Sequence, residues 1–168
     1  MKTEATATPT PTRASAATRW VTRERPKIDR IACPWLVLRF VDPRAEFLYV
    51  PASEVLRVAR ETGATPYDIP GVEMSHIGER CSFDAFVAKY ALTDPALHQL
   101  AAIVRGADTS RLDLTPQSAG LYAISLGLSR LHADDHAMLA HGLVMYDALY
   151  AWCREGQAEA HAWPPQMA

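Results

Sequence analysis

The sequence predicts an α+β fold, with a small sheet of about three strands covered by several helices and a helical C-terminal half. In the first third of the chain, short segments rich in aromatic and β-branched residues flank an apolar, helix-like segment. From Ser53 onward, apolar residues recur at helical spacing behind capping residues. The length of 168 residues suits one compact domain.

Strands are expected at residues 20–22, at residues 46–50 (EFLYV) and, more weakly, at residues 65–69 (TPYDI). The segment DRIACPWLVLRFVD lies between the first two strands, and its apolar run ends at Asp42-Pro43. We interpret this segment as a helix, so the domain is expected to open with a strand, a helix and a strand.

The later helices are predicted from their starts. Two starts have a serine as the cap before an amphipathic segment, at Ser53 and Ser82. Two others have a capping residue followed by proline at the first helical position, at Asp94-Pro95 and Thr115-Pro116. The last helix is expected to begin near Asp134 and to run to about Arg154, because apolar residues keep helical spacing over this range.

Composition sets the domain limits. Residues 1–19 are mostly Ala, Thr, Pro and Ser without apolar periodicity, and we expect a flexible tail there. A single domain is expected over residues 20–155, followed by a frayed C-terminus at 156–168. The sequence has no long apolar span and no secretory signal, so it predicts a cytoplasmic protein without membrane contact.

Several function classes lose support. The 17 Lys and Arg residues against 19 Asp and Glu residues give a net charge of −2, which disfavours generic nucleic-acid binding. The G-x-G-x-x-G, P-loop, G-x-S-x-G and H-E-x-x-H motifs are absent, so no nucleotide cofactor is expected. The 3 cysteines cannot all pair within one chain, and we expect reduced thiols.

Two cysteines stand beside expected helix starts. Cys81 immediately precedes Ser82, and Cys33 precedes Pro34, a residue suited to the first turn of a helix. The positive end of a helix stabilises a thiolate, which is a metal ligand or a nucleophile. The alternative is that each cysteine is a small buried apolar residue.

His76 lies five residues before Cys81 in the loop VEMSHIGERCSFD. A loop that brings imidazole and thiolate together indicates half of a transition-metal site, for zinc or iron. We expect His76 and Cys81 as ligands, with Cys33 or Asp29 as the third. Glu73, Asp84 and His136 are less favoured. The alternative is an exposed histidine that only hydrogen-bonds its own loop.

The mixed-charge stretch TRERPKIDRIACPW adds an anion-binding hypothesis. Arg30, with Arg80, is expected to balance charge or to receive a tetrahedral oxyanion, and Asp29 to orient His76 or Arg30. Surface ion pairs explain Arg23, Arg25 and Lys27 better. Elsewhere, helix capping explains Asp134 and Asp135, and turn chemistry explains Asp108.

The segments KIDRIACPWL and HIGERCSFDAF, within residues 20–155, resemble the C-terminal domain of the ChrB-type chromate-resistance regulators. The resemblance implies a role in chromate resistance, as a sensory or accessory domain beside a chromate efflux system. The site residues above predict a small inorganic ligand as its partner. The full-length regulators carry an N-terminal winged-helix-like region, whereas only the short tail precedes Trp20 here. We therefore expect no direct nucleic-acid binding from this chain.

Two other functions remain open. The first is a thiol-dependent redox enzyme that uses Cys81 or Cys33, with His76 as its base. The second is a protein-interaction module that forms a homo-oligomer or binds the regulator. Its interface would include four residues of the last helix, Met138, Met145, Tyr146 and Trp152. An ordinary core is the more common role for such a set of residues.

Overall fold

The computed structural model describes residues 16–159 and residue 161. The strands are β1 (Arg19–Arg23), β2 (Glu46–Val50) and β3 (Thr65–Pro66). The helices are α1 (Asp29–Phe40), α2 (Val55–Thr62), α3 (Ser82–Lys89), α4 (Pro95–Asp108), α5 (Ser118–Leu131) and α6 (Asp135–Ala151). A 3-10 turn, Ala52–Glu54, precedes α2, and a π-helical segment, Trp152–Gly156, follows α6. The predicted α+β class and helical C-terminal half are confirmed.

The sheet is parallel throughout, with the strand order β2-β1-β3. Helix α1 connects β1 to β2, and α2 connects β2 to β3, because parallel neighbours need such crossovers. Strand β3 is shorter than the predicted 65–69, since Asp68 takes a left-handed conformation with φ of 52°.

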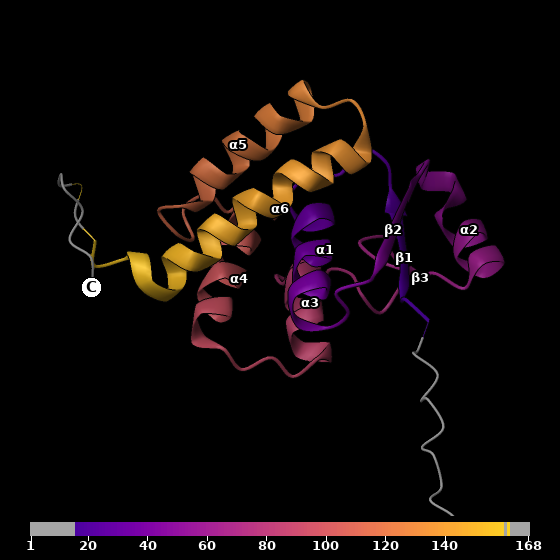
Figure 1. Cartoon of the computed structure of the whole chain (residues 1–168), viewed down its shortest axis with the longest axis horizontal. Helices are drawn as coiled ribbons and strands as arrows, with labels where there is room; N and C mark the ends of the chain where they lie inside the picture. Colours follow the sequence, from indigo (N-terminus) through magenta and orange to yellow (C-terminus); the bar gives the residue numbers. More distant parts are fainter. Residues whose placement is uncertain (1–15, 160, 162–168) are drawn as a thin grey trace, which may run out of the picture.

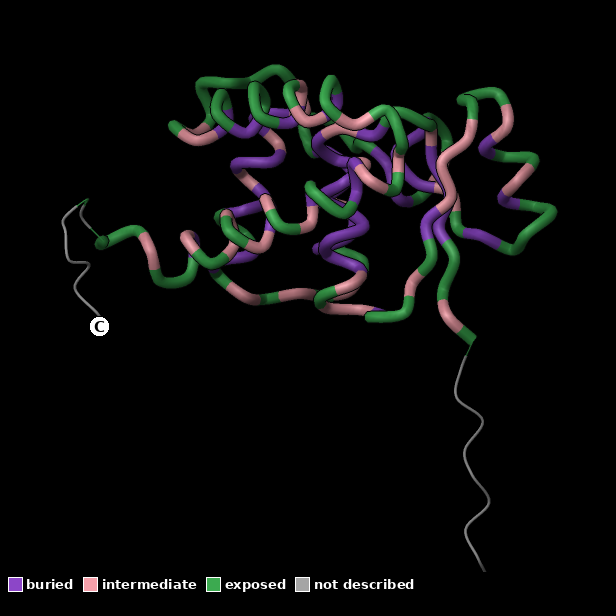
Figure 2. The backbone as a smooth tube through the Cα atoms, turned by 45° about the horizontal axis from the view of Figure 1, so that its top comes forward, coloured by how far each residue is buried: buried purple, intermediate pink, exposed green. Residues whose placement is uncertain are grey.

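The helices cover the two faces of the sheet unequally. In β1, Val21 packs with Val55 and Ala59 of α2, whereas Trp20 belongs to the larger core on the opposite face. Figure 1 accordingly has α2 alone on one side of the strands and the other helices on the other side. Figure 2 shows that buried residues concentrate in the middle of the molecule.

Helix α1 is the centre of the larger core. Its residue Trp35 is fully buried, and its ring lies 5.3 Å from that of Tyr150 and 6.4 Å from that of Phe83, measured between centroids. The indole Nε1–H donates to Asp147 of α6 at 2.8 Å. Trp35 therefore connects three helices.

Pro34 lies inside α1, not at its start, and this corrects the expectation for Cys33. A proline lacks the N–H that would bond the carbonyl four residues earlier, which is that of Arg30. Two tyrosine hydroxyls replace it, because Tyr49 and Tyr67 donate to the Arg30 carbonyl at 3.3 and 3.1 Å. The helix therefore continues through the proline, and its first residue is Asp29.

The last helix begins as predicted. Asp134 accepts a hydrogen bond from the Ala137 N–H at 2.7 Å, and α6 follows. Gly142 lets α6 approach α1 closely, since a Cβ there would lie 2.4 Å from Ile31 Cγ2. Met138 and Tyr146 are buried, and Met145 and Trp152 pack against the same core. These four residues therefore serve the domain's own core.

The other predicted helix starts vary in accuracy. Asp94 caps α4 by accepting from the Ala96 N–H at 2.9 Å, with Pro95 at the first position, as predicted. Cys81 rather than Ser82 caps α3, because the Ser82 hydroxyl donates to Asp68. Helix α5 begins later than Thr115-Pro116, and Thr115 instead contacts the Ser118 hydroxyl at 2.8 Å.

The expected tail and frayed end lie largely outside the described residues. At the inner end of the predicted tail, the Thr18 N–H and hydroxyl donate to Asp42 at 2.8 and 2.9 Å, and β1 begins at Arg19. Within the described residues, no helix combines the length and the apolar character needed to cross a membrane.

Candidate functional site

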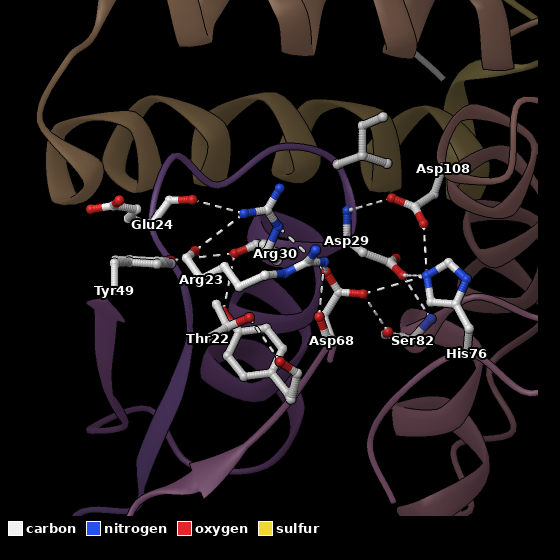
Figure 3. Close-up of polar contacts among 12 residues, drawn as sticks. Thr22, Arg23, Glu24, Asp29, Arg30, Tyr49, Asp68, His76, Ser82 and Asp108 are labelled. Carbon is white, nitrogen blue, oxygen red and sulfur yellow. Dashed lines mark hydrogen bonds and ion pairs between the residues drawn. The ribbon is translucent and has the colours of Figure 1, made fainter. Parts of the chain in front are cut away.

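A cluster of carboxylates around one imidazole lies at the carboxyl ends of β1 and β3 (Figure 3). It consists of Asp29, Asp68, His76 and Asp108, and we call it the Asp/His cluster. The N-termini of α1 and α3 meet at the same place. Ligands of parallel sheets commonly bind at this edge, because strand ends and helix N-termini converge there.

Asp29 is the innermost member of the cluster, with no exposed surface. It is the first residue of α1, and its carboxylate accepts from the Ser82 N–H at 2.6 Å and the Phe83 N–H at 3.4 Å. Those N–H groups belong to the first turn of α3, where an anion is stabilised. The preceding residue, Ile28, has φ of 45°, which is strained for a β-branched side chain. The Tyr146 hydroxyl bonds its carbonyl at 3.1 Å and holds it there.

Asp68 links the cluster to two arginines. Its Oδ1 accepts from the Ser82 hydroxyl at 2.8 Å, and its Oδ2 lies 3.0 Å from Arg23 and 3.4 Å from Arg30. Arg30 also donates to the carbonyls of Arg23 and Glu24, so its fork is directed into the protein. Burial lowers the pKa of Arg30. Arg30 is therefore paired with Asp68 inside the fold, and its role toward an oxyanion stays a prediction.

His76 contacts all three carboxylates through one ring nitrogen. Its Nε2 lies 2.9 Å from Asp108, 3.4 Å from Asp29 and 3.4 Å from Asp68. The loop that carries it turns tightly, since Gly78 has φ of 60° and Ile77 and Arg80 exchange two backbone hydrogen bonds. The expected contact between Asp29 and His76 is present.

The cluster has the donor atoms of a metal site. Three ligand atoms lie within 4.8 Å of one another, one from each of Asp29, Asp68 and His76. Asp108 is the fourth group, and its other carboxylate oxygen faces the Asp29 N–H at 3.4 Å. Carboxylates and imidazole together suit divalent iron, zinc or manganese. The residues present thus fit a transition metal, with oxygen donors in place of the expected sulfur donors.

Burial and charge in the cluster raise the pKa values of three of its members. The pKa of His76 rises to about 9, first through its polar contact with Asp29 and then through the charges of all three carboxylates, against the effect of burial. The pKa of Asp108 rises to about 7, first through burial and then through repulsion by Asp29 and Asp68. Burial likewise raises the pKa of Asp29, opposed by His76.

These shifts predict a pH dependence. His76 and Asp108 both bind a proton more tightly in the folded chain, so the free energy of unfolding of the metal-free domain should fall as pH rises. The contribution of Asp108 to stability is lost between pH 3.8, its ordinary pKa, and about pH 7, and that of His76 is lost between pH 6.5 and about pH 9. Urea unfolding in a chelator, at several pH values, measures this. His76→Gln should reduce the fall between pH 6.5 and about 9 by the share that His76 contributes; a rise in stability over that range in the parent protein contradicts the assignment.

Neither of the two predicted thiol ligands belongs to the converging group of ligand atoms among the described residues. Cys33 is the fifth residue of α1, and Cys81 is the N-cap of α3 with its Sγ 3.5 Å from Asp84. Both are buried, and burial together with the nearby carboxylates raises the pKa of both thiols. The predicted thiolates are therefore not favoured, which also weakens the thiol-dependent redox hypothesis.

The less favoured ligands have other partners. Glu73 contacts Lys89 at 2.6 Å, Asp84 forms a two-pronged pair with Arg105, and the His136 Nε2 lies 2.9 Å from the Phe47 carbonyl. Arg25, expected at the surface, donates to the carbonyls of His132 and Ala133 after α5. None of these contacts leads to the Asp/His cluster.

An open cavity of 970 Å³ lies beside the cluster. His76 and Asp108 form part of its wall, together with Arg80, Arg105 and Arg111. Arg80, the second arginine of the anion hypothesis, therefore faces this cavity, whereas Arg30 contacts Asp68. The two predicted arginines serve different places.

Sequence reasoning missed Asp68 and overlooked the role of Asp108. Asp68 directly follows the residues of β3, a position where parallel strands present ligands, and this signal was available. Asp108 is the last residue of α4, and the sequence around it indicates only a residue of a turn after a helix. No neighbouring residue indicates that Asp108 faces His76.

The chain matches one family model, described as "ChrB, C-terminal domain", over residues 20–153. The chain belongs to the ChrB C-terminal domain family. Protein ChrB of Cupriavidus metallidurans is 32% identical over 132 residues, 78% of this chain. Those residues span only 39% of that relative. No solved structure matches the chain. All four members of the Asp/His cluster lie within the range that the ChrB family model covers.

Proposed function

We propose that this ChrB-family domain acts in chromate resistance as a sensory or accessory domain that binds a divalent transition metal. Asp29, Asp68 and His76 are its ligands, and Asp108 completes or supports the set. The convergence of three ligand atoms within 4.8 Å carries the proposal. The family membership supplies the physiological context.

The surroundings of the cluster support a metal over a purely structural ion pair. Three carboxylates face one imidazole, while Arg23 and Arg30 contact only Asp68 among the members of the cluster. Burying several carboxylates together is costly, since each repels the others. A divalent cation relieves this repulsion better than the single charge of a protonated imidazole. Its binding displaces the proton from Nε2.

Oxygen-rich coordination decides among the metals. With the thiols outside the group, the set of two or three carboxylates and one imidazole favours iron(II), zinc or manganese(II) over copper(I), which prefers sulfur. A bound metal would supply Lewis acidity or redox chemistry. The chain's own groups orient the ligands: the α3 N–H groups hold Asp29, and the Ser82 hydroxyl holds Asp68.

Elemental analysis of protein purified without a tag tests the proposal. We expect a divalent transition metal near one equivalent in the parent protein and in Cys81→Ser, and its loss in His76→Gln and Asp68→Asn. Glu73→Gln, which removes an exposed carboxylate paired with Lys89, is the matched control. Equal metal content in all variants, or its loss only in Cys81→Ser, overturns the assignment of these ligands.

A further inference from the structure

We propose that the cavity beside the Asp/His cluster binds a tetrahedral oxyanion, through the guanidinium groups of Arg80 and Arg111 and the Nδ1–H of His76. This inference deepens the proposed function and depends on it for the role of the ligand. The binding itself is measured separately from that of the metal.

The positive charges come from three segments around one space. Arg80 belongs to the turn at Ile77–Arg80, Arg105 to the last turns of α4, and Arg111 to the loop before α5. Arg105 is occupied by Asp84, at 2.7 and 2.8 Å. In residues 16–159, the Arg80 side chain has no hydrogen-bond or ion-pair partner. A guanidinium directed to a cavity without a partner can donate a fork to an oxyanion.

Arg111 is nearly as available. Its side chain is exposed and paired with Asp113 at 3.2 Å, a contact that is weak because both groups are solvated. The side chain can therefore exchange this partner for a ligand at small cost.

His76 presents a donor to the same space. Its Nε2 is held by the carboxylates, and Figure 3 shows the other ring nitrogen on the side away from them. A ring held through Nε2 by a metal keeps its proton on Nδ1, as does a protonated ring. No hydrogen-bond partner of Nδ1 exists among the described residues, and the side chain is 40% exposed.

The lining selects a small, hard anion. Apart from His76 it contains no aromatic ring on which a base could stack, and it offers the hydroxyl-bearing residues Ser75, Thr109 and Ser110. Two acidic residues of the wall, Asp84 and Asp108, are paired with Arg105 and His76. Glu79 is the remaining carboxylate and opposes an anion. Tetrahedral oxyanions and phosphate esters share the required chemistry.

Calorimetric titration with molybdate, sulfate and phosphate tests the site, since none of them oxidises thiols. We expect Arg80→Ala to weaken binding at least about tenfold, the usual effect of losing a charge-assisted hydrogen bond, and Arg111→Ala to weaken it less. Arg80 is exposed and its backbone bonds remain, so the variant should fold. Arg60→Ala, an exposed arginine of α2 outside this cavity, should leave affinity within about twofold.

A variant of opposite sign sharpens the test. Glu79→Gln should tighten binding severalfold, because it removes a carboxylate that repels an anion and attracts Arg111. Glycerol 3-phosphate distinguishes a phosphate ester from a free oxyanion: equal or tighter binding of the ester assigns the site to esters and overturns the inorganic ligand. No binding by the parent protein, or equal affinity in Arg80→Ala, overturns the site. Metal content measured on the same samples shows whether the metal proposal fails with it.

Discussion

Replacing Asp29 with asparagine is expected to weaken divalent metal binding by more than about 100-fold while the metal-free domain remains folded. Losing even a supporting partner of a ligand costs about 10–100-fold in metal affinity, and Asp29 is proposed as a ligand itself. The asparagine Oδ1 can still accept from the Ser82 N–H, now 2.6 Å from Asp29. Competition with a fluorescent chelator measures the affinity.

Stability supplies the second readout for Asp29→Asn. Because a buried charge that repels Asp68 and Asp108 disappears, the free energy of unfolding without metal should stay equal or rise. The matched control is Glu54→Gln, which removes a half-exposed carboxylate of the Arg57 pair. Unchanged metal affinity in Asp29→Asn excludes Asp29 as a ligand, even if the other ligands are correct.

Replacing Trp35 with alanine is expected to lower the free energy of unfolding by about 3–5 kcal/mol, as large aromatic truncations in cores do. Trp35 is fully buried and contacts rings of Phe83, Tyr146 and Tyr150. The loss is a large share of the roughly 5–15 kcal/mol of a typical domain. Urea unfolding followed by circular dichroism measures it.

Trp35→Phe separates packing from hydrogen bonding. The phenyl ring keeps most of the contacts and loses the indole donor to Asp147, so its destabilisation should be clearly smaller than that of Trp35→Ala. Equal losses in the two variants would mean that the bond to Asp147, and not the aromatic cluster, is what Trp35 contributes.

Local signals explain how much of the fold could be predicted. Asp94-Pro95 and Asp134 were sufficient to place the starts of α4 and α6, because a cap bonds N–H groups only two or three residues away. The strand at residues 46–50 could likewise be predicted from its aromatic and β-branched residues. Such features depend on neighbours in sequence, and no tertiary contact overrides them.

The position of Pro34 inside α1 could not be found in this way. Pro34 indicates a first turn, but the hydroxyls of Tyr49 and Tyr67 satisfy the carbonyl that it leaves free. Those tyrosines come from other segments, so the sequence around Pro34 contains no trace of them. The prediction therefore placed Cys33 at the positive end of the helix, where a thiolate is stabilised, whereas Cys33 is the fifth residue of α1.

The candidate site was predicted in part. His76 and its partner Asp29 were identified from their loop and helix-start context, and the structure places them 3.4 Å apart. Asp68 and Asp108 come from two further segments, and only the assembled fold directs them to the same ring nitrogen. Burial, which sequence spacing does not reveal, raises the pKa of both predicted thiol ligands and so opposes a charged thiolate.

The four members of the Asp/His cluster belong to segments that meet only in the native state, so a ligand of the cluster has almost no affinity for the unfolded chain. Binding then raises the melting temperature by mass action, with about 2.7 kcal/mol gained when the free ligand exceeds its Kd about 100-fold. A thermal-shift panel of metal salts and oxyanions, added singly and in pairs, can therefore reveal the physiological ligand before any reaction is known.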